Sequence, residues 1–325
     1  EVYGGPILSS WLDRDLSIAG RVVFDDGGKL ASTLFNAFDA VAVIPSVAIH
    51  LNREVNKGIE LNAQEKLRAV LSVSVDEQDK KGFLKRLIGK ALGIDAARIH
   101  DADLYLFSAE PARLISGEDN MYVSGRIDNL GMSHAVMAAL CGSSAAEPTC
   151  VAALFDSEEI GSMTWQGAQS SFLRDLLHRI SLSFSDSNED FFRALAHSSL
   201  ISADAAHAVH PNYADKHDSY YVPNLNGGPV VKANARQSYT TTAESGERFI
   251  KLCKNHKIPV QKFIGRSDIP SGGTIGPITS ASLGIPSVDI GNPIWGMHSI
   301  RETAGTKDQP YMVDALKAFF QEGLN

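Results

Sequence analysis

The feature that most constrains this sequence is the alternation, from about Ile127 onward, of short apolar runs with amphipathic segments of helical spacing. It predicts strands at residues 150–155, 200–203 and 287–290, and helices at residues 130–140, 171–184, 243–256 and 311–320. Such alternation is typical of an α/β sheet that is covered by helices on both faces. We therefore expect an α/β domain with a mixed sheet over residues 123–325.

The first part of the chain has a different texture. Short β-rich runs at residues 21–24, 41–44, 47–49 and 104–107 are interrupted by the Asp25–Gly28 turn signal and by Pro45. Residues 76–92 are charged and carry a helical stripe of apolar side chains. We expect residues 1–122 to form a smaller β-rich domain, one side of which this helix covers, with its first residues belonging to the larger domain.

Composition excludes several classes of function. The 325 residues contain 30 lysines and arginines against 38 acidic residues, and a net charge of −8 argues against a nucleic-acid or anionic-membrane surface. No apolar run approaches the ~18 residues that a transmembrane helix needs. Cys141, Cys150 and Cys253 lack metal or redox spacing, which favours buried thiols in a reducing, cytoplasmic compartment. The sequence contains no P-loop, no Gly-x-Gly-x-x-Gly and no Gly-x-Ser-x-Gly pattern.

Acidic and histidine residues follow the predicted strands. Glu158 and Glu159 come after residues 150–155, Asp204 directly follows residues 200–203, and His298 follows residues 287–290, while Asp128 opens a helix. Ligand sites in open α/β sheets collect beyond the carboxyl ends of the strands, so we expect these side chains to converge. Carboxylates with an imidazole suit zinc, and a carboxylate that bridges two ions would explain why acids outnumber histidines.

Adjacent Glu158 and Glu159 would then have different roles, because one carboxylate can bind metal while the other serves as general base. Structural readings remain open for each residue taken alone. Asp128 also suits a helix cap, the two glutamates suit a solvated loop, and Asp204 suits a structural strand end. Residue spacing therefore makes a two-metal site one of several alternatives.

Longer sequence blocks carry a family resemblance. The blocks at residues 126–130, 158–162, 202–213, 273–277 and 297–302 resemble signature blocks of the aspartyl aminopeptidase family of di-zinc metallopeptidases. The resemblance continues at residues 2–5, 13–21 and 50–53, so that it covers nearly the whole chain in order. It implies an α/β catalytic domain of the di-zinc exopeptidase type into which a β-rich dimerisation domain is inserted.

The resemblance also implies roles for the acidic cluster. Asp128 matches the carboxylate that bridges two zinc ions. Glu159 and His298 match terminal ligands of one ion, Asp204 matches a ligand of the other, and Glu158 matches the general base. Two zinc ions per subunit are expected, with cobalt or manganese as alternative metals.

Further positions match residues that contact the substrate: His207, Lys232 and Tyr239. His50 resembles a histidine that the smaller domain supplies to a neighbouring subunit, in a family that assembles as a dodecamer. Lys232 lies in an apolar strand, where an ammonium needs an anionic partner, and a substrate carboxylate would supply one. We therefore expect a homo-oligomeric aminopeptidase that prefers N-terminal aspartate or glutamate.

One zinc ligand of the family is missing from the printed sequence. It lies in a His-x-Asp motif upstream of the block that here begins at Val2, so we expect further sequence before Glu1. Two alternatives remain. A catalytically silent binding or cargo relative would account for the missing ligand, and a related di-zinc amidohydrolase acting on acylated amino acids would share the metal site.

Overall fold

The computed structural model describes residues 1–73, 80–118, 120–144, 147–270 and 272–324, and it divides the chain into two compact units. The smaller unit comprises Glu1–Val2, Pro6–Ala112 and Ser299–Arg301, and the larger comprises Tyr3–Gly5, Arg113–His298 and Glu302–Asn325. Residues 113–122, which we assigned to the smaller domain, therefore belong to the larger unit. The reason is strand pairing, since β5 (Met121–Ser124) pairs with β12 (Glu302–Gly305).

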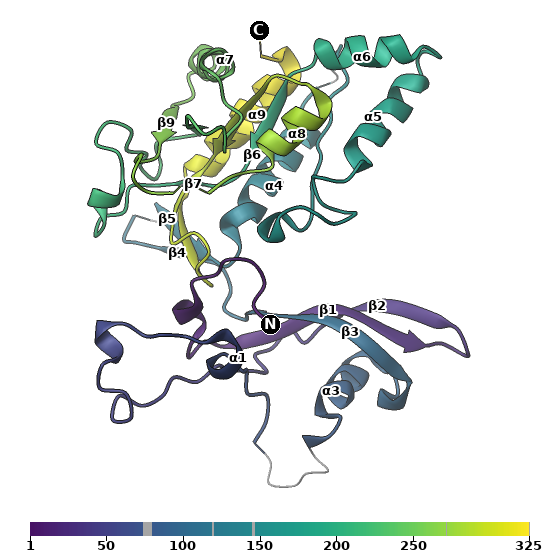
Figure 1. Cartoon of the computed structure of the whole chain (residues 1–325), viewed down its shortest axis with the longest axis vertical. Helices are drawn as coiled ribbons and strands as arrows, with labels where there is room; N and C mark the ends of the chain where they lie inside the picture. The colour runs from purple at the N-terminus through teal and green to yellow at the C-terminus, as the bar shows by residue number, and fades with distance from the viewer. Residues whose placement is uncertain (74–79, 119, 145–146, 271, 325) are drawn as a thin grey trace. The chain divides into compact units, whose positions relative to one another are not determined.

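The smaller unit is built on an antiparallel sheet with the order β2-β1-β3 (Figure 1). Its strands are β1 (Leu16–Asp25), β2 (Leu30–Asn36) and β3 (Ile99–Ser108), and the shorter elements are α1 (Ala63–Lys66), η1 (Leu8–Trp11), η2 (Val55–Lys57) and η3 (Ala96–Arg98). Helix α3 (Phe83–Leu92) covers one face, where its Ile88 packs against Val22 and Phe35. Helix α3 accounts for the last part of the helix predicted at residues 76–92, of which residues 76–79 lie outside the described part.

Two strands predicted in the smaller unit do not form. Residues 41–44 make only isolated bridges, among them Leu12 with Ile44 and Val43 with Val70, and residues 47–49 form no strand. Pro45 lies between the two segments and lacks the N–H that a ladder needs. The apolar side chains of residues 41–44 are used in packing instead, with Ala42 and Ile44 buried against Leu16.

The larger unit contains two sheets. A mixed sheet has the order β6-β10-β8-β9, in which β6 is parallel to β10, β8 is antiparallel to β10, and β9 is parallel to β8. Its strands are β6 (Leu200–Ala203), β8 (Val230–Ala233), β9 (Gln261–Ile264) and β10 (Ser287–Gly291). A second sheet has the order β4-β5-β12-β11-β7, with β4 (Arg113–Ile115), β7 (Ala206–His207) and β11 (Pro293–Trp295) beside β5 and β12.

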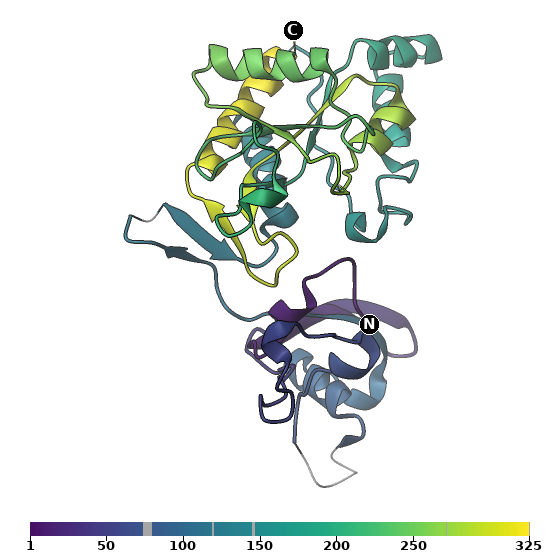
Figure 2. The same cartoon turned by 60° about the vertical axis from the view of Figure 1, so that its left-hand side comes forward.

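Helices pack on both faces of the mixed sheet (Figures 1 and 2). The helices are α4 (Ile127–Gly142), α5 (Phe172–Leu182), α6 (Asn188–Ala196), α7 (Ala243–Asn255), α8 (Gly276–Leu283) and α9 (Asp308–Glu322), with short turns η4 (Glu158–Ile160) and η5 (Ala214–Lys216). Val288 and Ile290 of β10 pack against α4, α7 and α9. Leu200 of β6 packs against α5, α6 and α8. Val288 pairs with Ile201 of β6, so the side chains of these two residues lie on the same face of the sheet. Leu200 directly precedes Ile201, and its side chain therefore lies on the opposite face. Helices α4, α7 and α9 thus cover one face of the mixed sheet, and α5, α6 and α8 cover the other.

The predicted α/β fold with a mixed sheet is confirmed. Each of the four predicted helices is present, and so are the strands at residues 200–203 and 287–290. The strand predicted at residues 150–155 is wrong, because this segment pairs with no strand. Its apolar side chains serve packing, with Cys150 against the α4–α9 core and Phe155 against the α5–α8 cluster. In the part of the chain that the structure describes, no helix combines the length and apolarity needed to cross a bilayer.

Candidate metal centre

Three of the predicted ligands meet in the larger unit. Asp128, Glu159 and His298 each offer a ligand atom, and these atoms lie within 4.8 Å of one another. The Nε2 atom of His298 is 3.4 Å from Oδ2 of Asp128 and 3.5 Å from Oε2 of Glu159. The three residues come from the start of α4, from η4 and from the loop after β11, so the fold brings together positions that are distant in sequence.

The local backbone at the start of α4 places Asp128 at the centre. Arg126 occupies the capping position with φ of 58°, and Asp128 itself is not helical, with φ of −79° and ψ of 110°. The peptide bond between Asp128 and Asn129 is cis. The Asp128 side chain is only 7% exposed. Asp128 is therefore not the helix cap that its position in the sequence allowed.

Two further groups orient the ligands, and the sequence assigned a role to neither. Glu302 on β12 is buried, and its carboxylate accepts the backbone N–H of His298 at 2.8 Å and of Asp128 at 3.0 Å. The Nδ1 atom of His298 lies 3.0 Å from the carbonyl oxygen of Gly5. Since a carbonyl only accepts, Nδ1 carries the proton in this contact and Nε2 faces the carboxylates. A carbonyl oxygen that accepts the other ring N–H in this way fixes the tautomer of a metal-binding histidine.

We predict that Glu302→Gln weakens zinc affinity about 10- to 100-fold, the usual effect of removing a group that orients metal ligands. A glutamine side chain has one acceptor oxygen, so it cannot accept both the Asp128 and the His298 N–H groups. The measurement is a zinc competition titration with a chromophoric chelator. Unchanged zinc affinity in a folded variant would show that the two backbone contacts do not orient the ligands.

Charge is crowded around these residues. The pKa of Glu158 rises to about 7, chiefly through burial, and the carboxylates of Asp204, Glu159 and Asp128 contribute to the rise. Burial also raises the pKa of Glu159. The hydrogen bond with Asp128 is the main reason why the pKa of His298 rises to about 9. Acids that repel one another in this way favour a bound cation, so the donor set of two carboxylates and one imidazole fits a zinc ion.

Asp204 lies next to this group, and it is paired with Lys232. The pKa of Asp204 rises to about 6, chiefly through burial, while Lys232 opposes the rise and a hydrogen bond with the Asp128 side chain contributes to it. The Nζ atom of Lys232 is 3.3 Å from Oδ2 of Asp204, 3.1 Å from its carbonyl oxygen and 3.0 Å from the carbonyl oxygen of Ala205. Asp128 thus lies between the Glu159–His298 pair and Asp204, as a bridging ligand would.

These contacts correct one premise of the sequence analysis. Lys232 is only 2% exposed, and we reasoned that it lacks an anionic partner until substrate arrives. Asp204 supplies that partner within the chain itself. Burial alone would lower the pKa of Lys232, but the carboxylates of Asp204 and Asp289 raise it, so the side chain stays charged.

The other predicted substrate residues surround Lys232, with one exception. The ring of Tyr239, which is 4% exposed, lies 5.2 Å from Nζ of Lys232, and the ring of Phe263 lies between Tyr239 and His207. Burial and the Lys232 charge lower the pKa of His207 to about 4, so its imidazole is neutral at pH 7. His50 belongs to the smaller unit, where it is exposed.

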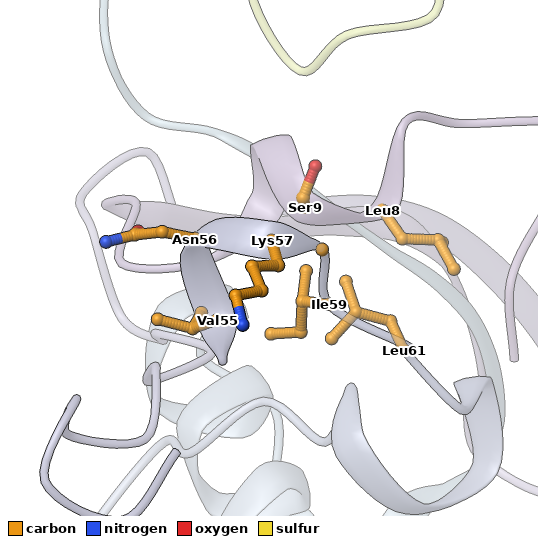
Figure 3. Close-up of a pocket in the computed structure, with 8 residues that line it drawn as sticks. Leu8, Ser9, Val55, Asn56, Lys57, Ile59 and Leu61 are labelled. Atoms are coloured by element: carbon orange, nitrogen blue, oxygen red, sulfur yellow. The ribbon is translucent and has the colours of Figure 1, made fainter. Parts of the chain in front are cut away.

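The smaller unit also has an open pocket of about 560 Å³ (Figure 3). It is lined by residues 8–9, 55–59 and 61, which include four apolar side chains beside the polar Ser9, Asn56 and Lys57. Lys57 is paired with Glu54 at 2.6 Å. No residue that lines this pocket is a predicted site residue.

Comparison with known proteins decides the family. Residues 1–320 match the family of aminopeptidase I zinc metalloproteases, M18. The chain belongs to the M18 aminopeptidases. The predicted resemblance to the aspartyl aminopeptidase family is thereby confirmed, and so is the prediction of a zinc-dependent peptide hydrolase of the aminopeptidase type.

Relatives of this M18 chain share most of its length. A probable M18 family aminopeptidase 2 of Clostridium novyi is 45% identical over 322 residues, which are 98% of this chain and 74% of the relative. The corresponding protein of Stutzerimonas stutzeri is 44% identical, with the same coverage of both chains. The chain therefore spans about three quarters of the length of these relatives.

Solved structures agree with the fold. A cryo-EM structure of an Ape4 and Nbr1 complex contains a chain that is 35% identical, with a TM-score of 0.94 over 99% of this chain and 65% of its own length. The S. cerevisiae mApe1 dodecamer gives a TM-score of 0.82 at 27% identity, over 99% of this chain and 72% of that one.

Proposed function

We propose that the protein is a cytoplasmic di-zinc aminopeptidase that removes single N-terminal residues from peptides, preferentially aspartate or glutamate. The observation that carries the proposal is the convergence of Asp128, Glu159 and His298 within 4.8 Å, with Asp204 hydrogen-bonded to Asp128 on the other side. A carboxylate flanked in this way suits two ions rather than one.

The residues present account for most of a two-metal donor set. Asp128 would bridge the two ions, Glu159 and His298 would complete one of them, and Asp204 would bind the other. Bound zinc supplies a Lewis acid that polarises the scissile carbonyl and makes water a stronger nucleophile at neutral pH.

Glu158 is suited to move the proton. Its pKa of about 7 means that the carboxylate is readily deprotonated and reprotonated near neutral pH. Its charge interacts with those of Glu159, Asp128 and Asp204, but Glu158 is not one of the three residues whose ligand atoms lie within 4.8 Å of one another. In the proposed reaction Glu158 takes a proton from the attacking water and then gives it to the leaving amine.

The carboxylates also explain why cleavage would stop after one residue. A free α-ammonium group is attracted to the acidic cluster, and a peptide bond farther along the substrate would leave that charge unpaired. Neutral His207 and the buried ring of Tyr239 lie around Lys232 and would contact the first side chain of the substrate.

The preference for acidic residues rests on Lys232. A substrate carboxylate would take the place of Oδ2 of Asp204, which at 3.3 Å is the longest of the three contacts of the ammonium. We predict that Lys232→Met lowers kcat/KM for aspartyl peptides about 5- to 150-fold relative to leucyl peptides, since one partly desolvated charge pair contributes about 1–3 kcal/mol. The measurement is kcat/KM for matched aspartyl and leucyl peptides with zinc in excess.

Methionine keeps most of the side-chain volume in this buried strand, so the comparison isolates the charge. An equal loss on both substrates, together with loss of zinc, would mean that Lys232 serves Asp204 alone. A wild-type preference for leucine would remove the acidic specificity and leave the aminopeptidase proposal intact.

We also propose a homo-oligomer, and by family resemblance a dodecamer, because exposed apolar side chains occur in both units. Phe38 and Leu51 in the smaller unit are 78% and 80% exposed, and Met163 and Trp165 in the larger unit are each 81% exposed. Neighbouring apolar side chains that are exposed to this extent suit a surface that another chain covers.

The experiment that tests the function uses the full-length protein and three kinds of substrate: peptides with a free N-terminus, the same peptides N-acetylated, and acetylated amino acids. We expect two zinc ions per subunit and release of one residue from free peptides only. Bound zinc without hydrolysis would favour a binding protein. Cleavage of acetylated amino acids instead of peptides would favour an amidohydrolase.

A further inference from the structure

Asp289 is a buried carboxylate to which the proposed reaction gives no role. It lies on β10 with 0% exposure, and both of its carboxylate oxygens are used. Oδ2 accepts the backbone N–H of Thr240, and Oδ1 accepts the hydroxyl of Thr274 at 2.7 Å. The backbone N–H of Asp289 is donated to the Thr241 hydroxyl oxygen at 2.9 Å. One residue thus joins two segments that are more than thirty positions apart.

The segment that carries Thr274 lies unusually close to this carboxylate. A Cβ atom placed on Gly276 would be 2.5 Å from Oδ2 of Asp289, which is too close for any side chain to fit. The N–H of Gly276 is donated to the Thr274 hydroxyl oxygen at 3.3 Å, so that the turn closes around the same group. Residues 273–277 are one of the blocks singled out in the sequence, and the structure gives them this contact.

The other segment leads to the predicted substrate residues. Tyr239 directly precedes Thr240, and its ring lies 5.2 Å from Nζ of Lys232. Asp289 is the register partner of Lys232 across the antiparallel β8–β10 pair, so the two side chains lie on the same face of the sheet. Asp289 is therefore next to both Lys232 and the residue that follows Tyr239.

We propose that Asp289 is a positioning residue, which fixes the Tyr239–Thr241 segment against β10 and so holds the Tyr239 ring beside Lys232. Hydrogen bonds between buried groups hold their partners firmly, and a segment held at two successive residues has little freedom to move. The substrate part of this inference rests on the proposed function, because it assumes that Tyr239 contacts substrate.

The test compares two glycines of one segment. Gly276→Ala pushes a methyl group into the Asp289 carboxylate and changes no polar group, whereas Gly272→Ala is the matched control, because a Cβ at Gly272 meets no atom within 4 Å. In the zinc-loaded full-length protein we expect Gly276→Ala to raise KM for aspartyl peptides about tenfold, with kcat changed less than about threefold and zinc content unchanged. Gly272→Ala should match the wild type.

A second readout does not depend on activity. Hydrogen exchange of the Thr240 amide should be at least about tenfold faster in Gly276→Ala than in the wild type or in Gly272→Ala. Unchanged exchange of the Thr240 amide would show that Asp289 does not hold the Tyr239–Thr241 segment. Faster exchange with an unchanged KM would show that this segment does not affect substrate binding. If the wild type cleaves no peptide, the proposed function fails, and hydrogen exchange still decides whether Asp289 holds the segment.

A second pair of variants covers the case in which Gly276→Ala does not fold. An asparagine at position 289 keeps an acceptor for the Thr240 N–H and can donate to the Thr274 hydroxyl, whereas alanine keeps neither contact. We therefore expect Asp289→Asn to stay within about threefold of the wild-type KM and Asp289→Ala to show the tenfold rise. Equal effects of the two variants on KM and on Thr240 exchange would overturn the positioning role.

Discussion

Glu158→Gln is expected to lower kcat by about 10²- to 10⁴-fold while zinc content and KM stay close to those of the wild type. The Glu158 carboxyl lies among the acidic residues, yet it is not one of the three side chains whose ligand atoms converge. A glutamine has nearly the same shape but cannot take a proton from water near neutral pH. The measurements are steady-state kinetics on an aspartyl peptide and zinc analysis of the same preparation.

Glu159→Gln is the matched control, because it makes the same chemical change at the next residue. Its Oε2 lies 3.5 Å from Nε2 of His298, within the group that fits a metal ion, so this variant should lose zinc. Activity should then recover in part when zinc is supplied in excess. A zinc-free Glu158→Gln beside a zinc-loaded Glu159→Gln would reverse the two assignments.

The sequence predicted the parts of the fold that depend on periodic burial. Helix α7 has the apolar spacing of a helix with one buried face, and β10 is a short fully buried run, so both were found from the pattern alone. Residues 150–155 have the same apolar texture as β10, and yet they form no strand. Periodicity indicates which side chains are buried. A strand also requires a neighbouring strand to pair with its backbone, and the sequence of the segment does not show whether such a neighbour exists.

The predicted boundary between the two domains, at residue 122, was misplaced for a related reason. Residues 113–122 resemble the β-rich first part of the chain in composition, but β5 pairs with β12, which lies about 180 residues later. Nothing in the local sequence identifies so distant a partner. The meeting of Asp128 with His298 across a similar distance was expected from their places beyond the strand ends, and the family resemblance of the blocks that contain them gave them roles.

The groups that orient the site could not be predicted in the same way. Glu302 lies four residues after His298 in a recognised block, and this position was the one signal available for it. Its carboxylate accepts backbone N–H groups, which every residue possesses, so no residue type in the sequence points to the contact. The partner of Lys232 was missed because Asp204 had already been assigned to metal, whereas the structure shows that one carboxylate lies within reach of both roles.

Mixing two inactive variants, His50→Ala and Glu158→Gln, is expected to restore activity, because we expect His50 to act in the active site of a neighbouring subunit. His50 lies in the smaller unit, beside Leu51, which is 80% exposed, and Ile49, which is 47% exposed. An imidazole among exposed apolar side chains suits a surface that another subunit covers. The family resemblance implies that His50 helps to stabilise the oxyanion formed from the scissile carbonyl, and loss of one such group lowers kcat by about 10²- to 10³-fold, so each variant alone should be nearly inactive.

The activity that mixing restores is limited by the fraction of sites that receive both intact residues. A working site needs Glu158 from one subunit and His50 from its neighbour, and random 1:1 mixing meets both conditions, each with a probability of one half, in about a quarter of the sites. The two variants carry different affinity tags and are unfolded and reassembled together, and activity is measured on oligomers that retain both tags. Each variant reassembled alone serves as the control. If His50 acted in the active site of its own subunit, mixing would restore nothing, because neither variant carries both residues. Doubly tagged oligomers without recovered activity would therefore place His50 in its own subunit's site or outside the site altogether.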